Sequence, residues 1–268
     1  MRIPAHLAAA AALAPLVPLP AQPGAAQELE VRIRGTDGDV AFHFAVREGV
    51  EVCDHGVVSR GGRTRWSWRG DEEEQICSTG LAEAVFTVRS GAVRDVDLDP
   101  WEGAGSTPAG VRDLGRVPAP EAAGFLLSMA RSGRDAVDAA KDGLFVAVLA
   151  DSVEVWPDLL ELARDRSLDD EVREGAVFWL GQEASDAVTA DLLELAAADD
   201  EDQDLRDAAV FALSRRADDE AVPALMELAR TADQAETRRS AMFWLARSED
   251  PRVLPFFEEI LLGRAGGG

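Results

Sequence analysis

The first part of the chain alternates apolar and polar residues with a period of two, which is the pattern of half-buried strands. The apolar positions of the first two predicted strands are Leu29, Val31, Ile33, Val40, Phe42, Phe44 and Val46. Residues 35–39 between them have the composition of a hairpin loop. A second hairpin is predicted from about Leu81 to Leu98, with its turn at Ser90-Gly91. Its inward-facing residues are Phe86, Val88, Val96 and Leu98, and Asp95 and Asp97 face water. Residues 27–98 therefore predict a small antiparallel β domain, a sandwich or a barrel.

The stretch 99–120 is dense in glycine and proline and follows no period, so it predicts a linker. From Glu121 onward the apolar period becomes helical, and the segments repeat. A first helix recurs in steps of 33 residues, with copies at 125–131, 158–164, 191–196 and 224–229. A second helix follows each copy, at 140–143, 172–180, 205–213 and 237–245. Two helices in a unit of this length predict a stacked solenoid over 121–262, with a terminal helix near Arg252–Leu262 and a flexible tail at 263–268.

The second helices share the core Val/Leu-Arg-x-x-Ala-x-x-x-Leu, as in Val172-Arg173 to Leu180, with acids just before it. This pattern recurs in register three times, with a weaker first copy, and it resembles the HEAT repeat, in particular the short repeats of the phycobilisome-lyase-like group. The resemblance covers about 121–262 and implies a mainly α, HEAT-like solenoid of about four helix pairs plus a terminal helix. It further implies a scaffold that binds proteins along a concave face. Some relatives attach bilins, but no residue here indicates a chromophore or a lyase site.

The N-terminus has the features of an export signal. Arg2 is followed by an apolar stretch at residues 7–20 that is too short and too interrupted by proline to span a bilayer. The small residues of Gly24-Ala25-Ala26 predict cleavage after Ala26, so that 1–26 is a signal peptide, although an uncleaved anchor is the alternative. The mature chain is then expected to be periplasmic or secreted, with no membrane insertion.

Cys53 and Cys77 are the two cysteines of the chain. An exported protein with two cysteines favours a disulfide between them. Two free thiols are one alternative. The other is a metal site made of Cys53, His55, Cys77 and His43, whose spacing fits no recognised zinc pattern. His43 lies on the polar face of its predicted strand, where a surface position is expected.

The charge is strongly acidic, with 50 acids against 27 bases and a net charge of −23. A nucleic-acid partner is therefore excluded, because binding to phosphates needs a basic face. Residues 120–268 hold 33 of the acids and 15 of the bases. That field would steer a basic protein or peptide toward the solenoid, although solubility alone also accounts for it.

No sequence motif for catalysis or cofactor binding stands out. The chain has no phosphate-binding glycine loop and no His-Glu-x-x-His motif. The acidic runs Asp71–Glu74 and Asp199–Asp204 lack the glycine and distal glutamate of a calcium loop. The sequence thus predicts a non-catalytic protein without cofactor or metal.

One aromatic position repeats outside the apolar stripe of the second helices. Phe178, Phe211 and Phe243 occupy it in three successive units. The charged residues four positions before or after them are Glu174, Asp207, Arg215, Arg239 and Arg247. We expect these residues to form a ladder about 10 Å per step along the concave face, with its arginines toward one end and its acids toward the other. The alternative is that the rings simply pack between neighbouring repeats.

Taken together, these patterns predict a scaffold exported to the cell envelope that binds a protein or peptide through its solenoid. Two other functions stay open at this point. One is an enzyme, lyase-like or with a site in the β domain around Cys53, His55 and Trp66. The other is a purely structural module.

Overall fold

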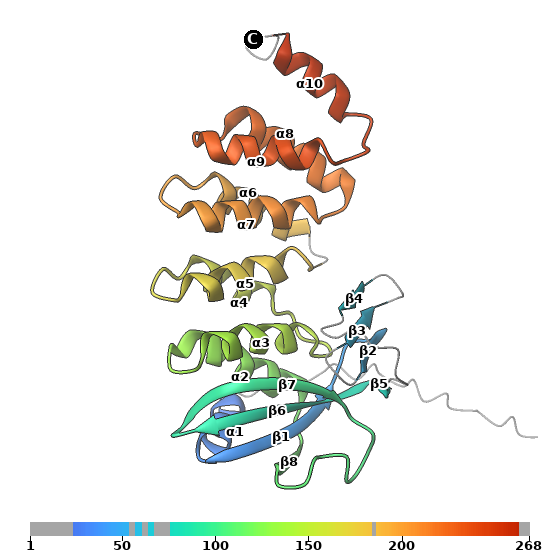
Figure 1. Ribbon diagram of the computed structural model, residues 1–268, viewed down its shortest axis with the longest axis vertical. Coiled ribbons are helices and arrows are strands. Elements are labelled where there is room, and N and C mark those ends of the chain that lie inside the picture. Colours follow the sequence, from blue (N-terminus) through green and yellow to red (C-terminus); the bar gives the residue numbers. More distant parts are fainter. Residues whose placement is uncertain (1–23, 54–56, 61–63, 67–75, 184–185, 263–268) are drawn as a thin grey trace, which may run out of the picture.

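Figure 1 shows the computed structural model, in which the helix pairs are stacked above a β-sheet region at the N-terminal end. The structure describes residues 24–53, 57–60, 64–66, 76–183 and 186–262. The larger sheet has the strand order β7-β6-β1-β8. Its strands are β1 (Gly38–Ala45), β6 (Leu81–Arg89), β7 (Ala92–Pro100) and β8 (Arg112–Arg116).

The β6–β7 hairpin confirms the prediction made from its alternation. Ser90 and Gly91 form the turn, both with positive φ, and Arg89 pairs with Ala92 across it. The residues expected inside are buried, and Asp95 and Asp97 are exposed. Phe86 is fully buried and its ring stacks on Phe42 of β1, with centroids 5.2 Å apart.

The prediction of a first strand at residues 28–34 is wrong, because this segment is the helix α1 (Ala25–Arg34). Leu29 and Ile33 fit a strand of period two, but they also lie four residues apart and so share one face of a helix. Both are buried, whereas Val31 between them is 72% exposed. Arg34 fixes the end of α1 by donating two hydrogen bonds to the Asp135 carboxylate, at 2.7 and 2.8 Å.

The expected sandwich or barrel is also wrong, because helices cover the inner face of the large sheet. The helix α2 (Ala119–Ser132) packs against the sheet, and its Phe125 ring meets Phe86 edge-on at 5.5 Å. Helix α1 lies against α2, where a side chain at Gly124 would come within 3.1 Å of the Ala26 β-carbon. The N-terminal region thus has the predicted antiparallel strand pairs β1–β6 and β6–β7 together with helices, and it is called the N-terminal α/β unit here. The predicted cleavage after Ala26 falls in the first turn of α1, and residues 1–23 lie outside the described part of the chain.

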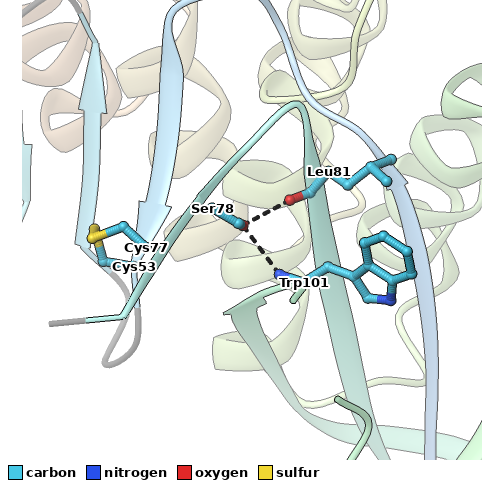
Figure 2. Close-up of a disulfide and its surroundings, with 5 residues drawn as sticks. All are labelled: Cys53, Cys77, Ser78, Leu81 and Trp101. Atoms are coloured by element: carbon cyan, nitrogen blue, oxygen red, sulfur yellow. Dashed lines mark hydrogen bonds between the residues drawn. A yellow bond between two sulfur atoms is a disulfide. The ribbon is translucent and has the colours of Figure 1, made fainter. Parts of the chain in front are cut away.

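Four short strands form a second sheet, in the order β4-β3-β2-β5. They are β2 (Val50–Cys53), β3 (Val57–Arg60), β4 (Thr64–Trp66) and β5 (Cys77–Thr79). The Cys53–Cys77 disulfide joins β2 to β5 at directly opposite positions, as predicted (Figure 2). Beside it, the Ser78 hydroxyl donates to the Leu81 carbonyl at 2.8 Å and accepts from the Trp101 amide at 3.1 Å. The disulfide-linked strand therefore anchors the ends of β6 and β7.

The stretch expected to be a linker is partly built into the sheet. β7 runs to Pro100, β8 occupies 112–116 and pairs with β1 in parallel, and α2 begins at Ala119. The glycines and prolines of 99–120 shape the turns around β8. The large sheet is therefore mixed, and one continuous set of buried apolar side chains runs from it into the helices.

The helical array confirms the repeat prediction. Its first helices are α2, α4 (Trp156–Arg164), α6 (Asp186–Ala197) and α8 (Asp218–Thr231). Its second helices are α3 (Val137–Val148), α5 (Asp170–Leu180), α7 (Gln203–Ser214) and α9 (Ala235–Leu245). α10 (Val253–Leu261) stands alone at the far end (Figure 1). No helix in the described part of the chain is both long and apolar enough to cross a membrane.

The repeated arginine of the second helix joins the two helices in three of the four pairs. Arg173 donates from Nε to the Ala163 carbonyl at 3.1 Å, and Arg238 donates to the Ala232 carbonyl at 2.6 Å. Arg206 donates to the Ala198 carbonyl at 3.2 Å. Each guanidinium thus satisfies carbonyls that the end of the first helix leaves unpaired. This explains why arginine recurs at that position.

Candidate protein-binding face

Aromatic rings form an unbroken row across the second helices. The row, called the aromatic ladder here, consists of Phe145, Trp179, Phe178, Phe211, Trp244 and Phe243. Successive ring centroids lie between 5.0 and 6.4 Å apart. The ladder therefore crosses α3, α5, α7 and α9 as one connected apolar strip.

The spacing differs from the sequence prediction of separate rings about 10 Å apart. Phe178 and Phe211 stack directly at 6.4 Å, and Trp244 lies between Phe211 and Phe243. Helix axes in contact are about 8–10 Å apart, but large side chains lean across that gap. Gly181 assists the close approach of α5 and α7, since a β-carbon there would come within 2.8 Å of the Ala212 β-carbon.

None of the three predicted phenylalanines belongs to the core. Phe178 and Phe211 are half-buried, and Phe243 is 55% exposed. The rings touch one another between repeats and still present an edge or face to solvent. The sequence reasoning missed Phe145, Trp179 and Trp244 as members of the ladder. Trp179 and Trp244 directly follow Phe178 and Phe243, and this repeated Phe-Trp pair was the available signal.

Three carboxylates line the ladder on the side of the helix N-termini. They are Asp142, Glu174 and Asp207, one on each of α3, α5 and α7, and they are called the acid row here. Glu174 and Asp207 precede Phe178 and Phe211 by four residues, so each shares a helix face with its ring. All three are half-buried, and within the described residues no hydrogen bond or ion pair reaches them. The Oδ1 atom of Asp207 is fully enclosed without a partner.

Two carboxylates of the acid row, Asp142 and Glu174, lie in surroundings that disfavour their ionised forms. Burial raises the pKa of Glu174, and the nearby Asp204 and Asp202 raise it further. Burial also raises the pKa of Asp142 to about 6, with Asp95 as the next cause. A cation placed beside these carboxylates would relieve both the repulsion and the desolvation.

The acidic field continues from α3 onto the sheet. α3 packs along β7, and Asp95 and Asp97 of β7 both contribute to the raised pKa of Asp142, together with Asp138 of α3. Lys141 lowers it, but its ammonium group is 2.8 Å from the Glu171 carboxylate and is held there. The sheet edge and the second helices therefore present one acidic surface.

We predict that the Asp142→Asn variant is more stable than the parent at neutral pH. The folded-state pKa of about 6 lies above the ordinary 3.8, so ionising Asp142 destabilises the folded chain, and this cost is fully present above about pH 6. Removing the charge should raise the free energy of unfolding by about 1 kcal/mol at pH 7.5, after allowance for partial solvent screening. The gain should shrink toward pH 4.5, where the folded parent is protonated. Urea denaturation at the two pH values measures it, and an equal gain at both would contradict the assignment.

The arginines predicted beside the ladder lie on its margin. Arg247 is above the rings of Phe243 and Trp244, with its guanidinium carbon 5.7 and 5.9 Å from their centroids. Arg215 is exposed at the end of α7. Arg239 replaces the acid of the row in α9, and its side chain is 73% exposed. The structure brings the acids together along three helices and leaves the cations toward α9 and the helix C-termini.

The residues of the alternative enzyme site lie only partly within the described structure. Cys53 is in the disulfide, and His55 lies outside the described residues, as do Asp71–Glu74. Trp66 is in β4, opposite Val58. The exposed position expected for His43 is wrong, because its ring is half-buried and stacks under Trp101 at 4.4 Å. The acids of 199–204 bind arginines: Asp200 and Glu201 contact Arg166, and Asp202 contacts Arg173.

The repeat geometry agrees with the comparison with known families. A family model described as HEAT repeats matches residues 156–246 and 190–265. From α4 to α10 the helical array is therefore built of HEAT repeats. The match covers α4 to α10, and the N-terminal α/β unit lies outside it. In searches of curated proteins and of solved structures, nothing matches. HEAT repeats typically form non-catalytic scaffolds for protein interactions, and in this HEAT array the aromatic ladder lies on the second helices.

Proposed function

We propose that this protein is an exported scaffold that binds a protein or peptide through the second helices of its HEAT array. The observation that carries the proposal is the aromatic ladder, a continuous strip of rings that the fold leaves partly open to solvent. Aromatic anchors surrounded by charged groups are typical of binding hot spots. Phe243 contacts Trp244 and Arg247 but remains more than half exposed, so a large apolar side chain is open to solvent there.

Export is part of the same proposal. Its support is the N-terminal pattern of charge, apolar stretch and small residues, together with the Cys53–Cys77 disulfide. Disulfides persist in oxidising compartments outside the cytoplasm. The partner is therefore expected in the envelope or outside the cell.

The test is affinity capture from an envelope fraction with the full chain and a ladder variant, Phe178→Ser, Phe211→Ser and Phe243→Ser. We expect the ladder variant to remain folded and to lose at least nine-tenths of the captured partner, because the apolar anchors are gone. Melting curves followed by circular dichroism report the folding of each protein.

The matched control changes three partly buried apolar side chains of the first helices: Leu160→Ser, Leu193→Ser and Met226→Ser. These occupy equivalent positions in three repeats, away from the ladder. The control is expected to retain the partner. Capture by the ladder variant at the level of the unmodified protein would refute the proposed function.

A further inference from the structure

We infer that the partner is an extended, positively charged segment whose cations lie over the acid row while its apolar side chains lie on the aromatic ladder. This inference rests on the proposed function and specifies the chemistry of the segment bound. Two observations meet at one surface: a solvent-open apolar strip, and carboxylates that form no hydrogen bond or ion pair within the described residues.

The first helices differ from this row in how several of their acids are paired. On the first helices, arginines pair with acids of the next repeat: Arg131 with Asp158, Arg164 with Glu194 and Arg230 with Glu259, at 2.5 to 3.0 Å. The chain thus neutralises acids across repeats on one side of the array. On the other side, Asp142, Glu174 and Asp207 have no such arginine. A half-buried carboxylate without a hydrogen bond is costly, and an incoming cation with donor groups would remove that cost.

The geometry favours an extended chain. Equivalent positions on stacked helices recur about every 10 Å. A polyproline II segment advances about 3.1 Å per residue with three residues per turn, so every third side chain points the same way after about 9 Å. Lysines at every third residue would therefore meet the acids of α3, α5 and α7 in turn. Residues on the neighbouring edge of the segment would lie over the rings.

The length of the basic stretch is limited at both ends. At α9 the acid position is occupied by Arg239, which repels a further cation. At α3 the row merges with Asp95 and Asp97 of β7, which would hold the cation over Asp142 from a second side. About three cations spanning roughly 20 Å are expected, from three helices at that spacing.

The experiment uses the full chain and a labelled 15-residue peptide with five Lys-Pro-Leu repeats, measured by fluorescence anisotropy. We expect the row variant, Asp142→Asn, Glu174→Gln and Asp207→Asn, to bind this peptide at least tenfold more weakly. A control variant, Glu161→Gln, Glu194→Gln and Glu227→Gln, removes the same charge from equivalent positions of the first helices. It should bind within about twofold of the unmodified protein.

A second peptide of equal composition, with its five lysines consecutive, tests the spacing and should bind more weakly than the repeating one. Binding of the repeating peptide should also weaken from pH 7.5 to pH 5, as Asp142 takes up a proton. Equal losses in the row and control variants would show attraction by net charge alone and would overturn the inference. So would equal binding of the two peptides, or no binding of the repeating peptide to the unmodified protein.

The outcomes also separate this inference from the proposed function. If the row variant captures the envelope partner normally while the ladder variant does not, the scaffold function stands and the basic partner is refuted. If the ladder variant captures it normally, the proposed function itself fails.

Discussion

Replacing Phe86 by alanine should lower the free energy of unfolding by about 3–5 kcal/mol, the usual cost of deleting a buried phenylalanine. Phe86 is fully buried in the large sheet, where it stacks on Phe42 and meets Phe125 of α2 edge-on. Its loss would open a cavity where the sheet and the HEAT array share their core. Urea denaturation followed by circular dichroism measures the change.

The same measurement on Phe243→Ala provides the control, since this residue is of the same type but more than half exposed. It should cost less than about 1 kcal/mol, because little apolar area returns to water. The Phe86→Ala substitution should lower the stability of the α2–α3 pair as well as that of the sheet. A variant that melts the sheet while leaving the helices at their original stability would contradict a shared core.

Replacing Arg173 by alanine should cost about 3 kcal/mol of stability. Its side chain is 4% exposed and lies 2.5 Å from Glu201 and 3.0 Å from Asp202. Removing one member of a buried ion pair is costly, and here it leaves Glu201, whose side chain is 8% exposed, with only the half-exposed Arg166 as a counterion. The Ala163 carbonyl also loses its donor.

Arg166 offers a matched comparison, because it contacts the same Glu201 carboxylate at 3.2 Å but is half exposed. Arg166→Ala should cost less than about 1 kcal/mol, as exposed ion pairs generally do. Arg173→Lys should fall between the two, since lysine keeps the charge but lacks the planar fork that reaches four acceptors. Equal costs for the two alanine variants would show that the buried position of Arg173 is unimportant.

The helical part of this fold follows closely from the sequence, whereas the N-terminal part does so only locally. Because the pattern repeats, each helix prediction is supported by the equivalent helices of the other repeats. A weak copy such as α3 can therefore still be predicted. The segment 28–34 had no such support, and Leu29 and Ile33 satisfy both a strand and a helix. β8 has no alternating pattern in its sequence. It is a strand because it pairs with β1, and a tertiary contact of this kind is not visible in the local sequence.

The candidate face was predicted in part for a similar reason. Phe178, Phe211 and Phe243 stand out because they repeat in register, and Glu174 and Asp207 follow from their spacing of four residues. Asp142 was missed because Val146 and not an aromatic residue lies four positions after it, although it precedes Glu174 by one 32-residue step. The contact between rings depends on how far large side chains lean between helices, which sequence spacing does not determine.

The two ends of the HEAT array differ, and this sets the order in which its helices are expected to unfold locally. At one end α2 and α3 are held by the sheet, and at the other α10 is the last helix of the described residues. Leu254, Leu261 and Leu262 are each more than 60% exposed there. A cavity of about 420 Å³ lies between α8 and α10, against Phe256. Because each repeat is stabilised chiefly by its neighbours, fluctuations should begin at α10 and progress inward, so that α9 and the far end of the aromatic ladder loosen long before the end anchored on the sheet.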